Sequence, residues 1–109
     1  MSQHIFETEH DGKLRKVFAG WDRPLQGFYM TIENTTPDED TDEVFIFNNL
    51  VLKDSHPKTF EPFIHALVDL GLVIPKEMID EIVADGKVNI GNKVVEHSNE
   101  GEYKRKQLY

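Results

Sequence analysis

Apolar and polar residues alternate in the first third of the chain and predict a β-hairpin there. Asp11-Gly12 is the residue pair that a type I′ turn prefers, because both central residues of that turn adopt positive φ. Counting outward from this turn gives the cross-strand pairs His10–Lys13, Glu7–Lys16, Phe6–Val17 and Ile5–Phe18. In this register opposite charges face each other and apolar side chains face each other, which stabilises an antiparallel ladder.

Two further strands are predicted before the chain turns helical. Pro24 ends the second strand, because proline cannot donate a hydrogen bond to a ladder. Beyond it, Phe28, Met30 and Ile32 recur with the two-residue period of a half-buried strand. Residues 38–43 carry five acidic side chains and predict a solvated loop. The stretch VFIFNNLVL, residues 44–52, is apolar on both faces and predicts a central strand.

The hydrophobic period becomes that of a helix after residue 57. Apolar residues recur at helical spacing at Phe60, Phe63, Ile64, Leu67 and Leu70. We place the N-cap at Thr59, because Pro62 then falls in the first turn, where proline is tolerated, and Gly71 ends the helix. A second helix is predicted over residues 75–86. The connection of residues 72–74 is short and apolar, which predicts two helices packed closely as a pair.

Residues 87–97 predict a last strand, or a hairpin around Gly91-Asn92, and a flexible polar tail follows from about residue 99. The chain is therefore expected to form a single domain over residues 1–109. Its fold class is α+β: a mainly antiparallel sheet of four to five strands, with a helix pair packed on one face. The expected order along the chain is four strands, two helices and one strand.

Charge and composition narrow the classes of partner. Twenty acidic residues against twelve basic ones give a net charge of −8, which repels phosphate backbones and argues against nucleic acid as a partner. The sequence has no cysteine, no signal-peptide pattern at its start and no apolar run long enough to cross a bilayer. We expect a cytoplasmic protein that binds no membrane.

Two groups of residues suggest metal binding. Asp38, Asp40 and Asp42 match the opening of a calcium-binding loop, but its sixth and twelfth positions hold Glu43 and Asn49 instead of glycine and glutamate. Glu61, His65 and Asp69 share one face of the first predicted helix and are candidate metal ligands, although such spacing is common on exposed helix surfaces. No phosphate-binding, nucleophile-elbow or dinucleotide motif occurs, so no cofactor is expected and the protein is interpreted as non-catalytic.

The corner Trp21-Asp22-Arg23-Pro24 is the candidate contact site. Tryptophan, arginine and tyrosine predominate in interface hot spots, and Trp21 and Arg23 lie at this corner with Tyr29 nearby. The competing interpretation is that Trp21 turns inward and fills the end of the sheet, as the single tryptophan of a small domain usually does. The favoured hypothesis is a module that binds another protein through Trp21, Asp22, Arg23 and Tyr29.

Three alternatives remain open. The acidic residues could imitate nucleic acid and inhibit a DNA- or RNA-binding protein. The chain could be a small cofactor-independent enzyme, with His65, His97, Asp22 or Arg23 as reacting groups. It could also be a homo-oligomer in which residues 44–52 or the helix pair complete their core in a second subunit.

Overall fold

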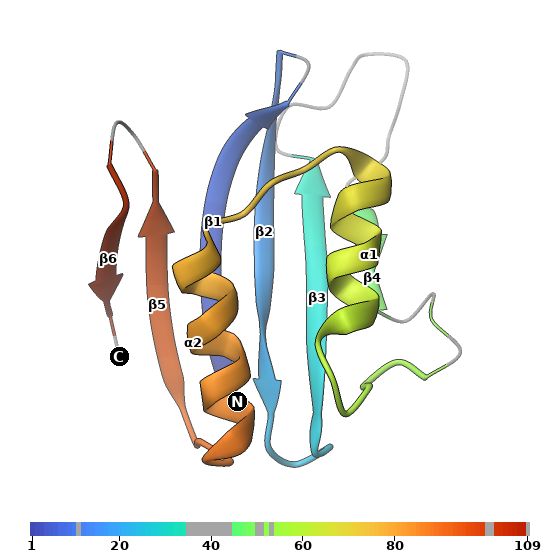
Figure 1. Cartoon of the computed structure of the whole chain (residues 1–109), viewed down its shortest axis with the longest axis vertical. Helices are drawn as coiled ribbons and strands as arrows, with labels where there is room; N and C mark the ends of the chain where they lie inside the picture. The colour runs from blue at the N-terminus through green and yellow to red at the C-terminus, as the bar shows by residue number, and fades with distance from the viewer. Residues whose placement is uncertain (11, 35–44, 50–51, 53, 100–101, 109) are drawn as a thin grey trace.

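The strands and helices of a computed structural model are shown in Figure 1. It describes the chain except for residues 11, 35–44, 50–51, 53, 100–101 and 109. The elements are β1 (Ser2–His10), β2 (Lys13–Asp22), β3 (Gly27–Asn34), β4 (Phe45–Asn48), α1 (Glu61–Leu70), α2 (Lys76–Lys87), β5 (Lys93–Ser98) and β6 (Lys104–Gln107). None of the helices in this part of the chain is long and apolar enough to span a membrane.

The strands form a mixed sheet in the order β4-β3-β2-β1-β5-β6, and both helices cover the same face of it (Figure 1). The α+β class, with a mostly antiparallel sheet, is thus confirmed. The predicted hairpin register is also confirmed, with His10 paired to Lys13 and Ile5 to Phe18. The exception to antiparallel pairing is β5, which runs parallel to β1 and brings the two ends of the chain together.

The core lies between the sheet and the helices. Alternate residues of β2 and β3 point toward the helices, among them Val17, Met30 and Ile32, which are fully buried. Phe63 of α1 and Met78 of α2 belong to the same core cluster on the helix side and are also fully buried. The alternation of apolar and polar residues in the strands therefore leaves one face of the sheet covered and the other open.

The helix boundaries agree with the sequence to within a residue. Helix α1 begins at Glu61 with Phe60 as N-cap, one residue later than predicted, and Pro62 lies in its first turn. Gly71 ends α1 with φ of 72°, the left-handed conformation that favours glycine. Helix α2 begins at Lys76, directly after Pro75, and ends one residue beyond Gly86.

Three expectations about the arrangement differ from the structure. The predicted central strand is the four-residue β4, which lies at the edge of the sheet and pairs only with β3 among the described residues. The helices do not pack closely as a pair: α1 lies over β3 and β4, and α2 packs on β2 and β1 (Figure 1). A sixth strand, β6, occupies the segment that was expected to be a tail, because it adds to the edge of β5.

Candidate functional site

The structure buries two of the four residues predicted to contact a partner. Trp21 is 6% exposed and Tyr29 is 8% exposed. The Trp21 ring meets Phe28 edge-on at 4.9 Å, and its Nε1 donates a hydrogen bond to Asn89 Oδ1 at 3.0 Å. The Tyr29 hydroxyl donates to the carbonyl of Ser2 at 2.8 Å, and burial raises its pKa far above the usual value. Neither ring projects from the corner as an exposed anchor.

Arg23 is the exposed member of the predicted set, and Asp22 holds the corner in shape. Asp22 accepts a hydrogen bond from the Leu25 amide at 3.2 Å and faces the His56 ring at 3.7 Å. The Phe28 amide also donates to the Pro57 carbonyl at 2.9 Å, so the segment before α1 is fastened to the start of β3. Asp22 is therefore a half-buried residue that stabilises the corner, whereas Arg23 is exposed.

One side chain ties this corner to the end of α2. Asn89 Oδ1 accepts hydrogen bonds from Trp21 Nε1 at 3.0 Å and from Gln26 Nε2 at 2.8 Å. Both Asn89 and Gln26 have positive φ, 49° and 51°, although neither is glycine. Such backbone strain costs about 1–3 kcal/mol per residue and persists where surrounding contacts enforce it, often at binding sites. Asn89 thus links the Trp21 indole and the Gln26 side chain at this corner.

A groove of about 470 Å³ opens between α1 and α2, directly above the tryptophan. Its floor is aromatic and includes Trp21, Phe28 and Phe60. Ile64 of α1 and Val83 of α2 also line it. Pockets that bind ligands or partner side chains commonly have this size and an apolar lining. We call it the inter-helix groove.

Charged residues surround the inter-helix groove. Lys58 and Lys87 are exposed basic residues that line it, and Glu61 is the acidic one. Arg23 adds a further exposed base at the neighbouring corner. The groove thus has an apolar floor and a rim that is locally more basic than the chain as a whole.

A second site, which the sequence did not predict, is a buried chain of hydrogen bonds beneath α2. His4 of β1 is fully buried and lies 2.6 Å, Nε2 to Oδ2, from Asp85 of α2. The other ring nitrogen of His4 lies 2.8 Å from Nε2 of His97 in β5. His97 is 4% exposed, and its Nδ1 lies 2.7 Å from the hydroxyl of Tyr103. The chain therefore runs from a buried carboxylate to a half-exposed phenol.

Ion pairs continue this network to the surface. Lys93 contacts both Asp85, at 2.8 Å, and Glu81, at 2.6 Å. Glu81 also accepts two hydrogen bonds from the Arg105 guanidinium, at 2.6 and 2.8 Å. The two carboxylates of α2 are thus matched by two cations from β5 and β6. We call Asp85, His4, His97, Tyr103, Lys93, Glu81 and Arg105 the histidine network.

The network sets the protonation of its members. The hydrogen bond from Arg105 lowers the pKa of Glu81 to about 2. Burial alone would raise the pKa of Asp85, but hydrogen bonds from His4 and Lys93 outweigh it and hold that pKa below the usual value. Burial lowers the pKa of His97 to about 4, so its imidazole is neutral at physiological pH.

Three side chains of ligand type lie close together within this network. His4, Glu81 and His97 each offer one ligand atom, and these atoms lie within 4.8 Å of one another, the one such group in the described part of the chain. The sequence-predicted ligands Glu61, His65 and Asp69 are all exposed and form no such group. The other acidic candidates, Asp38 to Glu43, lie outside the described residues.

The histidines are scattered along the sequence with no metal-ligand spacing, so the sequence alone predicts no site shared by His4 and His97, and the structure corrects this. The parallel pairing of β1 with β5 brings them together, and a pairing between chain ends cannot be inferred from local periodicity. The sequence contains one signal of a buried polar network, which is Asp85. It lies seven residues after Met78 and three after Ile82, on the buried face of α2. An acid on an apolar stripe requires a buried partner.

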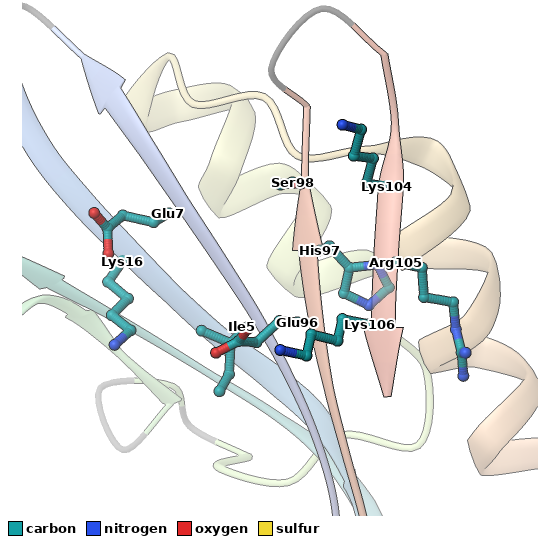
Figure 2. A pocket seen from close by; sticks show the side chains of 9 residues that line it. All are labelled: Ile5, Glu7, Lys16, Glu96, His97, Ser98, Lys104, Arg105 and Lys106. Carbon is teal, nitrogen blue, oxygen red and sulfur yellow. The ribbon is translucent and has the colours of Figure 1, made fainter. Parts of the chain in front are cut away.

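The open face of the sheet carries both charge signs. A hollow of about 510 Å³ lies on this face. Figure 2 shows Lys16, Glu96 and Lys106 around Ile5 among the side chains that line it. His97 and Arg105 of the histidine network also border this hollow. Acids and bases interleave here, so this face has no single-sign character.

No family model, curated protein or solved structure matches this chain. Its function is therefore argued from its own residues.

Proposed function

We propose that the protein is a non-catalytic module that binds another protein through the inter-helix groove and the adjoining Arg23 corner. The observation that carries this proposal is the aromatic floor of the groove, built from Trp21, Phe28 and Phe60. In this arrangement the buried Trp21 contributes to the contact as part of the floor, while Arg23 reaches out beside it.

The occupant that fits is an apolar side chain of the partner flanked by an acidic residue. The groove volume of about 470 Å³ accommodates a large aliphatic or aromatic group. Lys58, Lys87 and Arg23 supply the positive charge that an adjacent carboxylate would meet. Charge complementarity at a rim sets orientation and association rate, while the buried apolar contact supplies most of the affinity.

Rigidity supports the same proposal. Asn89 and Gln26 hold the corner at strained backbone angles, and Asn89 fixes the Trp21 indole. A preorganised surface loses less conformational entropy on binding than a mobile one. The corner would then bind a partner without a backbone rearrangement.

The test compares charge introduced inside and outside the groove on one helix. Ile64→Glu places a carboxylate within the groove, and Val68→Glu places one at an exposed position of α1 that does not line it. Wild type, these two variants and Arg23→Ala are used as bait in quantitative affinity purification from the source cells. We expect at least one protein to be retained by wild type and Val68→Glu, recovered in smaller amount with Arg23→Ala and lost with Ile64→Glu.

Folding is verified for each variant by circular dichroism before the comparison. Equal recovery of every partner by folded Ile64→Glu and by wild type would contradict the proposal.

A further inference from the structure

We infer that His4, His97 and Glu81 form a binding site for one divalent transition-metal ion of the zinc and cobalt class. The three residues come from β1, β5 and α2, and their ligand atoms lie within 4.8 Å of one another. Two imidazole nitrogens and one carboxylate oxygen are a donor set that these ions prefer. The site is independent of the inter-helix groove.

The residues behind the two histidines are arranged as in metal centres. A metal-bound histidine generally uses its second ring nitrogen to donate to a carboxylate or another acceptor, which fixes the ring. Here Asp85 lies at Nε2 of His4, 2.6 Å away, and the Tyr103 hydroxyl lies at Nδ1 of His97, 2.7 Å away. The remaining nitrogens, Nδ1 of His4 and Nε2 of His97, face each other.

The distance between those nitrogens is close to what a metal requires. They are 2.8 Å apart, which is a hydrogen bond when a proton lies between them. Two metal–nitrogen bonds of about 2.1 Å at a tetrahedral angle would separate them by about 3.4 Å. The rings therefore need to part by only about 0.6 Å, a movement that side-chain rotation can supply.

Protons can rearrange without leaving an unpaired group. In the metal-free state, Tyr103 donates to Nδ1 of His97, and Nε2 of His97 donates to Nδ1 of His4. In the bound state, the His97 proton occupies Nδ1 and donates to the Tyr103 oxygen, whose own hydroxyl proton turns toward solvent. His97 remains a neutral imidazole throughout, the form that binds metal.

Glu81 has room for one more bond and sets the selectivity. Its carboxylate takes three bonds from Arg105 and Lys93, and a carboxylate has about four lone-pair positions. A single carboxylate that already bonds to Arg105 and Lys93 is a poor site for Ca²⁺ or Mg²⁺, because these ions need several oxygen ligands. The nearby positive charges lower the affinity for any cation, so the two imidazoles must supply most of the binding, and they favour transition ions.

Burial indicates a structural role for the ion. His4 is fully buried, and the ion would join the first strand, the last helix and β5. One of the three ligand residues, His97, also lines a surface hollow of about 470 Å³ with Phe6, Thr8 and Val73.

The test is a metal titration of the full chain, made without a histidine tag and freed of metal with a chelator. ZnCl₂ and CoCl₂ are titrated separately by calorimetry, and the visible spectrum of the cobalt form is recorded. We expect one ion per chain, no binding of CaCl₂ or MgCl₂, and a thermal midpoint raised by zinc. His97→Gln should weaken zinc binding at least tenfold, and His65→Gln, a matched change of an exposed histidine, should leave it unchanged.

Two further measurements cover the case in which the His97 variant fails to fold. Tyr103→Phe retains all three ligands and removes only the acceptor at His97, and loss of such a supporting partner typically weakens metal binding about 10- to 100-fold. In the wild type, ¹⁵N spectra should show the His97 proton move from Nε2 to Nδ1 when zinc is added. Absence of zinc and cobalt binding by wild type, or binding that leaves the His4 and His97 ring signals unchanged, would overturn the inference.

Discussion

Gly86 in α2 allows the helix to approach the aromatic floor of the groove, and Gly86→Ala tests this packing. A Cβ at this position would lie 2.5 Å from Cζ of Phe28 and 3.2 Å from Cε3 of Trp21. Phe28 cannot easily yield, because its ring is buried between Trp21 and Phe60, at centroid distances of 4.9 and 5.8 Å. The added methyl group must therefore push the helix or the rings apart.

Two opposing contributions determine the expected change in stability. Replacing glycine by alanine inside a helix stabilises by up to about 1 kcal/mol, and less near a helix end. Overpacking a close-packed core costs about 1–3 kcal/mol. The balance predicts that Gly86→Ala lowers the free energy of unfolding by about 1 kcal/mol, which corresponds to a midpoint decrease of roughly 4 °C for a chain of this size.

The assay is urea unfolding followed by the fluorescence of Trp21, the single tryptophan. Ala84→Gly, at an exposed position in the same helix, measures the propensity contribution alone and should destabilise by about 0.5–1 kcal/mol. If the helix did not rest on Phe28, Gly86→Ala would stabilise the protein by about the amount that Ala84→Gly destabilises it. That result would refute the packing argument.

Three further predictions concern other contacts. Gly27→Ala places a Cβ against the His56 carbonyl oxygen and should destabilise by about 1–3 kcal/mol, with faster hydrogen exchange of the Phe28 amide, which bonds to Pro57. Phe63→Ala empties a fully buried position and should lower the free energy of unfolding by about 3–5 kcal/mol. The control Val68→Ala, at an exposed position of α1, should lower it by less than about 0.5 kcal/mol. In metal-free protein, the Glu81 pKa of about 2 lies below its ordinary 4.5, so its stabilising effect is complete above pH 4.5 and is lost as the pH falls toward 2. The free energy of unfolding, measured at several pH values, should decrease less on acidification for Glu81→Gln than for wild type. An equal decrease for both proteins would count against the hydrogen bond from Arg105 to Glu81.

The local sequence pattern was sufficient to predict the hairpin of β1 and β2 and both helices. The register from Ile5–Phe18 to His10–Lys13 followed from one turn and from charge pairing, because a hairpin is a contact between sequence neighbours. Pro62 and Gly71 fixed α1 to within a residue, because proline and glycine restrict the backbone directly.

What the sequence missed depends on contacts between distant segments. The stretch around β4 is apolar enough for a central strand, yet it lies at the edge because β5 adds beside β1 instead. The same parallel pairing assembles His4 and His97, which are 93 positions apart. No periodicity within β1 or β5 indicates that these two strands pair.

The predicted contact corner illustrates the same limit. Residue type alone suggested Trp21 as an exposed anchor, and the structure places its ring in the core below the groove. The groove itself exists because α1 and α2 lie apart over different strands (Figure 1). Its apolar floor could not be predicted while the helices were expected to pack as a pair.

The most direct measurement of the central proposal is a binding titration of the recovered partner with four forms of the protein. The proposal predicts that Ile64→Glu, inside the groove, weakens binding at least tenfold and that Arg23→Ala weakens it less. Val68→Glu, outside the groove on the same helix, should bind like the wild type. Equal affinities for the folded Ile64→Glu and Val68→Glu proteins would contradict a partner site in the inter-helix groove.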